Sequence, residues 1–175
     1  MAQLGSPNYK VGLIIARAQP FHNGHLKIIA DALMKCDEII VSFVDYNTNF
    51  FDYDINQQLG REVLGLNKRI SYFGTLHKPT LQIPKHYIEE TLIQLEDANY
   101  NMPTHFFTHY EDWVTPAMEL QLETKLISTL VDNSSRSIYE SLELENDDWK
   151  TKVPYSTIEM IETYIATKKR KKLIV

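Results

Sequence analysis

The sequence predicts an α/β protein in which helices flank both faces of a central, mostly parallel β-sheet. Three observations predict this class. The apolar run 11–15 leads through a short turn into residues 23–35, where apolar side chains recur at the three- and four-residue spacing of a helix with one buried face. A second apolar run, 39–44, follows directly. Two all-apolar runs joined by one helix form a right-handed βαβ unit with parallel strands.

Length and composition indicate one domain with a substantial core. The 175 residues are 43% apolar and 11% aromatic and carry a net charge of −5, which argues against a disordered chain and against general affinity for nucleic acid. We expect a loose leader over residues 1–10, one domain over 11–167 and a basic tail over 168–175. The sequence has no run long enough to span a bilayer and no signal-peptide pattern. Its single cysteine, Cys36, favours a buried thiol in a cytoplasmic protein.

Periodicity and turn residues predict the remaining elements. Residues 47–53 lack a clear period and predict an irregular loop, and residues 55–66 have helical character that Gly60 and Gly65 would break. The elements expected after these are a short strand over 72–77, a helix over 87–95, a fourth strand over 105–108, a fifth strand over 126–131, a helix that begins near Ser134, and a closing helix over 155–165.

The turn after the first strand holds two histidines, His22 and His25, on either side of Gly24. It lies at the carboxyl end of a parallel strand, where ligands bind, and it opens a helix whose free amide groups and dipole attract anions. Imidazole N–H groups donate to phosphate oxygens, and Arg17 can donate two N–H groups at once. Gly24 suits close approach of a ligand or a strained backbone dihedral. The turn therefore predicts a phosphate site; the alternative is a solvated loop.

This turn also resembles a family motif. Residues 17–25, Arg-Ala-Gln-Pro-Phe-His-Asn-Gly-His, resemble the Gly-Arg-Phe-Gln-Pro-Phe-His-x-Gly-His motif of nicotinamide mononucleotide (NMN) adenylyltransferases of the archaeal and bacteriophage type. His-x-Gly-His is shared by the whole nucleotidylyltransferase superfamily, and the preceding residues narrow the resemblance to this branch. Ala16 and Ala18 replace the family's Gly and Phe. The resemblance implies a Rossmann-like nucleotidylyltransferase fold and an enzyme that joins ATP and NMN to give NAD and pyrophosphate.

The resemblance implies roles for the residues of this turn. His22, His25 and Arg17 would be catalytic. The other contacts to ATP here would come from Ala16, Gln19, Phe21 and Gly24. Mg²⁺ would enter with ATP, and we expect no fixed metal site in the protein, because no cluster of residues has the spacing of a zinc or calcium site.

A second segment resembles the family's Ile-Ser-x-Thr-x-Ile-Arg junction, which binds the β- and γ-phosphates of ATP. In register with it, Ser134 matches the serine, Arg136 stands at the threonine, and Tyr139 stands at the arginine. The resemblance implies phosphate contacts from Ser134, Arg136 and Ser137. Either Arg136 reaches the phosphates from a shifted direction, or phosphate binding is weakened. Residues 147–154 resemble the family's continuation, which supports the register.

The nicotinamide nucleotide would bind near the ends of the other strands. The resemblance places contacts at Asp45 and Tyr46, which follow the second strand. The tryptophan that stacks on the nicotinamide ring in the family is missing; Tyr87 is the nearest aromatic residue and Trp113 is an alternative, each weighed against ordinary packing. In relatives the fourth strand ends in Ser-Gly-Asn, whereas here bulky residues beginning with His109 change the shape of the second pocket.

Other interpretations stay open. An adenylyl- or cytidylyltransferase acting on another phosphate would usually carry Gly-x-Phe-Asp before the histidines, and a nucleotide-binding module or sensor with weak or no turnover would fit the displaced arginine. Lys68 and Arg69, in a segment that resembles the family's helix-opening Glu-Arg-Ile, are either phosphate ligands or solvated charges. The expected partners are ATP and NMN, with no nucleic acid or membrane. A homo-oligomer is allowed, since relatives often assemble.

Overall fold

A five-stranded sheet with the order β3-β2-β1-β4-β5 organises the fold, and each of its four strand pairs is parallel. The computed structural model describes residues 9–16, 20–44, 51–65, 67–75, 83–128 and 134–172. The strands are β1 (Val11–Ala16), β2 (Glu38–Val44), β3 (Ile70–Thr75), β4 (His105–Thr108) and β5 (Glu123–Leu126). The expected α/β class with a parallel central sheet is confirmed.

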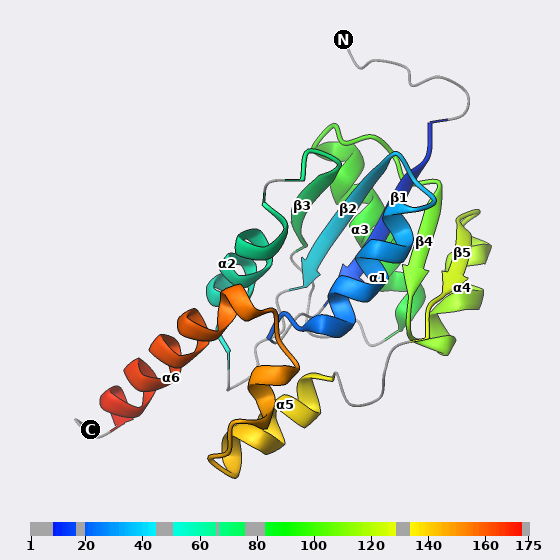
Figure 1. Cartoon of the computed structure of the whole chain (residues 1–175). Helices are drawn as coiled ribbons and strands as arrows, with labels where there is room; N and C mark the ends of the chain where they lie inside the picture. Colours follow the sequence, from blue (N-terminus) through cyan, green and yellow to red (C-terminus); the bar gives the residue numbers. More distant parts are fainter. Residues whose placement is uncertain are drawn as a thin grey trace.

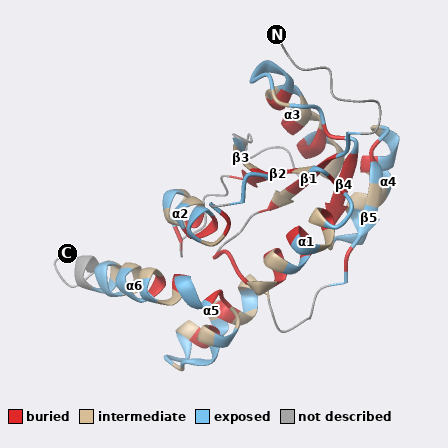
Figure 2. Cartoon of the chain, turned by 45° about the horizontal axis from the view of Figure 1, so that its top comes forward, coloured by how far each residue is buried: buried red, intermediate tan, exposed pale blue. Residues whose placement is uncertain are grey.

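Helices cover both faces of the sheet (Figures 1 and 2). Helices α1 (Asn23–Leu33) and α2 (Tyr53–Leu64) lie on one face, and α3 (Pro84–Asp97) and the short α4 (Val114–Glu119) lie on the other. After β5 come α5 (Ser135–Glu143) and α6 (Ile158–Lys172). In Figure 1, α5 lies beyond the end to which the arrows of β2 and β4 point. The short 3-10 turns are η1 (Glu111–Trp113), η2 (Asp148–Thr151) and η3 (Tyr155–Thr157).

Two apolar clusters hold these layers together. Neighbouring residues of β1 point to opposite faces, so Leu13 packs with the α3 side and Ile14 with the α1 side. Both faces of the strand are buried as a result, which explains why its sequence is apolar without alternation. The first cluster continues through Ile138 of α5 and Ile161 of α6, so the C-terminal helices are attached to the α1 side.

Helix α2 continues through Gly60, so the break predicted there is wrong. A Cβ atom at Gly60 would lie 2.5 Å from the Phe43 Cζ atom. Glycine is therefore favoured because it lets α2 pack directly against the ring of Phe43 on β2. The helix ends at Leu64, immediately before Gly65, as the sequence predicts.

The fifth strand lies earlier than predicted. It covers Glu123–Leu126, not 126–131, and it pairs with β4 along one side only. Both Glu123 and Lys125 are exposed, as is usual in an edge strand, so a search for an apolar run misses it. Residues 129–131 of the expected strand lie outside the described residues.

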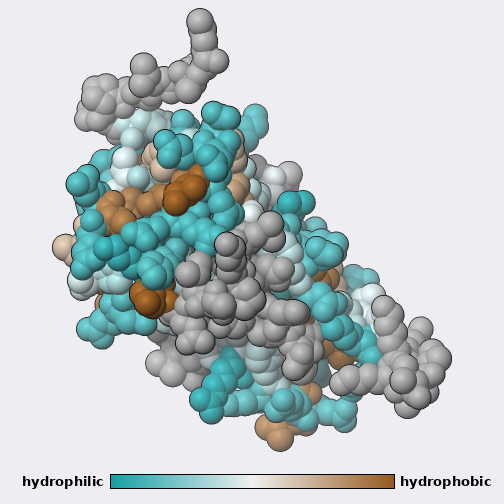
Figure 3. Space-filling view, turned by 180° about the vertical axis from the view of Figure 1, so that it is seen from behind, coloured by the Kyte–Doolittle hydropathy of each residue, from teal (hydrophilic) through white to brown (hydrophobic). Residues whose placement is uncertain are grey.

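The surface on the α3 side is mostly hydrophilic, with apolar side chains in separate small groups (Figure 3). None of the helices in the described part of the chain combines the length and the apolar composition needed to cross a bilayer. The basic residues from Lys168 onward continue α6 as far as Lys172. There Lys168 pairs with Asp52 at 3.0 Å and Lys169 with Glu145 at 2.7 Å.

Candidate active site

The strand order reverses at β1, and this reversal places the candidate site. From β1 the chain builds β2 and β3 on one side, then returns to add β4 on the other side. In parallel sheets the crevice outside the carboxyl ends at such a reversal is where ligands bind. His22 and His25 follow β1 at this point, and His109 follows β4 directly. The fold therefore brings three imidazoles to one edge.

The rings of His22 and His25 cap helix α1 reciprocally. The His22 Nδ1 atom accepts the Gly24 N–H at 3.1 Å, and the His25 Nδ1 atom accepts the His22 N–H at 3.3 Å. A neutral ring that accepts through Nδ1 carries its proton on Nε2. Neither Nε2 atom has a hydrogen-bond partner within the described residues. Each ring thus fixes the helix start with one nitrogen and keeps a donor on the other.

Burial keeps these imidazoles neutral. His22 is 7% exposed and His25 is 6% exposed, and their ring centroids lie 3.8 Å apart. Burial, and after it the nearby His109, lower the pKa of His22 from 6.5 to about 3. The pKa of His25 is lowered well below 6.5 by burial and then by His22 and His109, and burial also lowers the pKa of His109. Near neutral pH these three imidazoles are therefore uncharged N–H donors.

The backbone amides that open α1 are already satisfied inside the protein, so the expectation of free amide groups for an anion is wrong. The Asn23 N–H donates to the Lys152 carbonyl at 2.9 Å, the Gly24 N–H donates to the His22 ring, and the His25 N–H donates to the His22 carbonyl at 2.9 Å. No glycine in the described residues has a positive φ, which excludes a strained Gly24. An anion here would meet imidazole donors and the helix dipole.

Phe21 and Ala16 belong to the buried core next to the histidine turn. Phe21 is fully buried, and its ring stacks on His25 with centroids 5.4 Å apart. Ala16 is the buried last residue of β1. The ring of Phe21 therefore supports the imidazole of His25. Four other predicted site residues lie outside the described residues: Arg17, Gln19, Asp45 and Tyr46.

Helix α5 starts with hydroxyl caps at the predicted position. The Ser134 Oγ atom accepts the Ser137 N–H at 3.2 Å, and the Ser137 Oγ atom accepts the Ser134 N–H at 3.4 Å. Arg136 points to solvent, with 87% of its side chain exposed, and its Nε–H donates to Glu140 on the same helix at 2.8 Å. Tyr139 packs on the ring of Phe51. The structure therefore directs the Arg136 guanidinium along its own helix.

Lys152 connects the starts of the two helices. Its carbonyl accepts the Asn23 N–H at 2.9 Å, next to both histidines, and its Nζ donates to the Ser137 carbonyl in the first turn of α5 at 3.4 Å. The Asn23 side chain adds a hydrogen bond to the Thr151 carbonyl at 3.1 Å. Through this residue the histidine turn and the Ser134–Ser137 segment belong to one neighbourhood.

Tyr87 and Trp113 are brought together on the α3 side of the sheet. Their rings stack with centroids 6.0 Å apart, and Trp113 also packs on Phe106 at 6.1 Å. Tyr87 is buried, whereas Trp113 is partly exposed. Trp113 belongs to η1, which follows β4 at the same edge as His109. Trp113 is thus the more exposed of the two aromatic residues.

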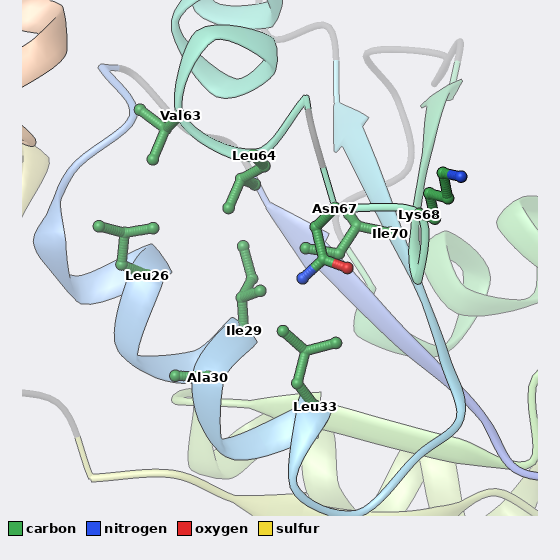
Figure 4. A pocket seen from close by; sticks show the side chains of 9 residues that line it. All are labelled: Leu26, Ile29, Ala30, Leu33, Val63, Leu64, Asn67, Lys68 and Ile70. Carbon is green, nitrogen blue, oxygen red and sulfur yellow. The ribbon is translucent and has the colours of Figure 1, made fainter.

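Lys68 and Arg69 lie before β3 starts, so they are at the amino edge of the sheet and not near the histidines. The Arg69 guanidinium donates to the carbonyls of Leu33 at 2.7 Å and Asp37 at 3.0 Å, and also to that of Cys36, and so closes the end of α1. The expectation that this segment opens a helix is wrong, since Ile70 begins β3. Lys68 borders a groove between α1 and α2 (Figure 4), whose other lining residues are Leu26, Ile29, Ala30, Leu33, Val63, Leu64, Asn67 and Ile70.

Two residues of this neighbourhood do not follow from the sequence motifs. The position of His109 could have been predicted, because His109 directly follows a buried strand whose carboxyl end adjoins the histidine turn. The position of Lys152 could not have been predicted from the sequence, since its approach to Asn23 depends on how the chain folds back after α5. Within the described residues no group of three or more His, Cys, Asp or Glu side chains is placed to hold a metal ion.

Comparison with solved structures shows which fold the chain has. The chain superimposes with a TM-score of 0.71 and 16% identity on a bifunctional NMN adenylyltransferase/ADP ribose pyrophosphatase from Francisella tularensis complexed with AMP and a Mn ion, covering 95% of this chain and 52% of that one. NadR, in complex with NAD and AMP-PNP, gives a TM-score of 0.60 and 14% identity, covering 85% of this chain and 46% of that one. The chain thus spans about half the length of these structures. It has a Rossmann-like nucleotidylyltransferase fold.

Sequence comparison relates the chain to one particular enzyme. The chain is 24% identical over 166 residues to nicotinamide-nucleotide adenylyltransferase from Methanococcus aeolicus, covering 86% of this chain and 87% of that protein. No protein-family model matches the chain. The resemblance to NMN adenylyltransferases that the histidine turn predicts is therefore confirmed.

Proposed function

We propose that this chain is a nicotinamide-nucleotide adenylyltransferase, which joins ATP and NMN to give NAD and pyrophosphate. The observation that carries the proposal is the pair of capping imidazoles at the reversal of strand order, each with its Nε2 donor unused by the described protein. The similarity to the Methanococcus aeolicus enzyme supports the same reaction.

The reaction needs no nucleophile from the protein. A phosphate oxygen of NMN attacks the α-phosphorus of ATP, the bond from that phosphorus to the bridging oxygen of the β-phosphate breaks, and pyrophosphate leaves with the electron pair. The protein must align the two phosphates and stabilise the charge that develops on them. His22 and His25 would donate their Nε2–H groups to the α-phosphate, with Arg17 beside them. Neutral donors suit this role because they require no proton transfer.

The remaining site residues complete the proposal. Ala16, Gln19, Phe21 and Gly24 would shape the ATP side, and Ser134, Arg136 and Ser137 would lie toward its β- and γ-phosphates. The nicotinamide nucleotide would lie toward Asp45, Tyr46, Tyr87 and Trp113. A divalent ion, Mg²⁺ in the cell, would enter on the phosphate oxygens of ATP, its usual mode of binding; the Francisella tularensis structure holds a Mn ion. We further propose a cytoplasmic location, and the proposal allows either a monomer or a homo-oligomer.

The test is direct product detection. The purified chain is incubated with ATP, Mg²⁺ and NMN, and NAD and pyrophosphate are quantified by chromatography. We expect both in equal amounts. In parallel reactions NMN is replaced by its acid form or by phosphopantetheine. In a further reaction ATP is replaced by CTP. Product in only one of these reactions would show that the chain catalyses a different nucleotidyl transfer. Binding of ATP by calorimetry, without product in any reaction, would indicate a sensor.

A further inference from the structure

We propose that Lys152 is a phosphate-binding residue of this site, and that its ammonium group contacts the β- and γ-phosphates of ATP and the leaving pyrophosphate. The proposal rests on the proposed function for the identity of the ligand. It rests on the structure for the position of the lysine, which joins the first residue of α1 to the first turn of α5.

The position of the main chain puts Lys152 at the site. Its carbonyl holds the Asn23 N–H, and Asn23 lies between the two capping histidines in the sequence. The flexible stem of a lysine carries its charge several ångströms away from that anchor. In this structure the stem leads to the Ser137 carbonyl. The ammonium group therefore lies at the first turn of α5, on the side proposed for the β- and γ-phosphates.

No carboxylate among the described residues neutralises the charge of Lys152. Within the described residues its ammonium group has a carbonyl partner and no carboxylate partner. Other basic residues of the C-terminal region are paired: Lys150 with Asp147 and Glu162 at 2.9 and 2.7 Å, and Arg136 with Glu140 at 2.8 Å. An ammonium group that is half-buried and lacks a counterion provides a ready partner for an anion.

The side of the site proposed for the β- and γ-phosphates also needs a cation, because Arg17 is assigned to the α-phosphate. His22 and His25 are neutral donors, and the Arg136 side chain points along its own helix to solvent. The triphosphate of ATP brings several negative charges, and charge grows on the leaving pyrophosphate as the bond breaks. Among the described residues that adjoin the histidine turn and the start of α5, Lys152 supplies the positive charge.

The experiment measures binding, so it does not depend on turnover. Calorimetry with MgATP, AMP and inorganic pyrophosphate is carried out on wild type, Lys152→Met and Lys152→Arg. A hydrogen bond to a charged group corresponds to a change of about tenfold to a hundredfold in affinity. We expect Lys152→Met to lower the affinity for MgATP and for pyrophosphate by that factor. The affinity for AMP, which has only the α-phosphate, should stay within about twofold of the wild-type value. Lys152→Arg should recover most of the loss.

Lys150→Met is the matched control, because Lys150 lies two residues away but is held by two carboxylates. It should bind MgATP as wild type does. The proposal is overturned if Lys152→Met binds MgATP with wild-type affinity, or if Lys150→Met loses as much affinity for MgATP as Lys152→Met does. It is also overturned if Lys152→Met loses affinity for MgATP and AMP equally and has a lowered Tm. Wild type that binds neither MgATP nor pyrophosphate would also overturn it. Wild type that binds them but makes no NAD would refute the proposed function and leave Lys152 to be decided by the binding data.

Discussion

Helices α1 and α5 begin with the same reciprocal arrangement of side-chain caps, built from imidazoles in one and from hydroxyls in the other. In α1, the Nδ1 atoms of His22 and His25 accept backbone N–H groups, and the opposite ring nitrogens keep their protons. In α5, the single oxygens of Ser134 and Ser137 make the caps themselves. An imidazole has a second polar atom on the far side of the ring, so it can start a helix and still bind a ligand. The comparison predicts that changes at the α1 cap mainly lower turnover near neutral pH, whereas changes at the α5 cap mainly lower stability.

The largest effect should come from removing the far ring nitrogen while keeping the cap. Asparagine caps helices well, and its side-chain oxygen can accept the Gly24 N–H. We therefore expect His22→Asn to fold but to lose at least about a hundredfold in kcat, as for one lost transition-state donor. Steady-state NAD formation and a thermal melt measure the two properties. A folded His22→Asn variant with the turnover of wild type would end the assignment of catalysis to this ring.

A second effect follows from the lowered pKa values at α1. The folded protein keeps His22 neutral down to about pH 3, whereas the unfolded chain takes up a proton below about 6.5. Stability should therefore be unaffected by this group above pH 6.5 and fall as the pH is lowered from 6.5 toward 3. The expected slope is on the order of 1 kcal/mol per pH unit for each buried imidazole.

Urea unfolding at pH 7 and pH 5 measures this slope. His22→Asn, which lacks the ring, should lose less stability between the two values than wild type does. Equal losses in the two proteins would show that other groups govern the acid response. The hydroxyl caps of α5 cannot produce such a response, since serine does not titrate in this range.

The next effect is a loss of stability at α5. Ser134→Ala removes the cap and should lower the free energy of unfolding by about 1 kcal/mol. Its effect on kcat should be much smaller than that of His22→Asn, because the hydroxyl is engaged with the Ser137 N–H. Ser135→Ala, at the first helical residue, is the control and should be neutral. A hundredfold loss of turnover in Ser134→Ala would break the contrast between the two helix starts.

The smallest effect is expected at Arg136. Its exposed pair with Glu140, one turn along the helix, contributes less than about 0.5 kcal/mol. Arg136→Ala should change the affinity for MgATP less than Lys152→Met does, and calorimetry on the two variants compares them directly. A larger loss in Arg136→Ala would mean that the guanidinium leaves Glu140 when ATP binds.

Local patterns predicted the parts of the molecule that depend on local physics. The unit β1–α1–β2, strand β4 and the cap of α5 follow from apolar runs, periodicity and capping residues, and the structure has them at or near the predicted positions. The edge strand β5 was misplaced because exposed strands lack a strong apolar signal. Helix α2 was divided at Gly60 because the ring of Phe43, which favours that glycine, belongs to a different element.

The residues of the candidate site also divide into those whose positions follow from local sequence and those whose positions depend on the tertiary fold. The position of His22 and His25 at the start of α1 could be predicted because strand, glycine and helix are consecutive in the sequence. Arg69 could not be understood locally, since it closes the end of α1 across 36 residues. Lys152 and His109 also reach the histidine turn through the tertiary fold. Residues 17–19 and 45–50 lie outside the described residues, and their predicted roles stay predictions.

Both ends of α1 depend on distant parts of the chain, and this has a consequence for synthesis on the ribosome. Arg69 holds the last turn, and the Asn23 side chain bonds to Thr151, 128 residues later. A nascent chain that has not yet exposed η2 can form the sheet beside β1 while the start of α1 still lacks its final partners. The ability to hold a nucleotide should therefore be acquired only after η2 has been translated and has folded back onto the start of α1.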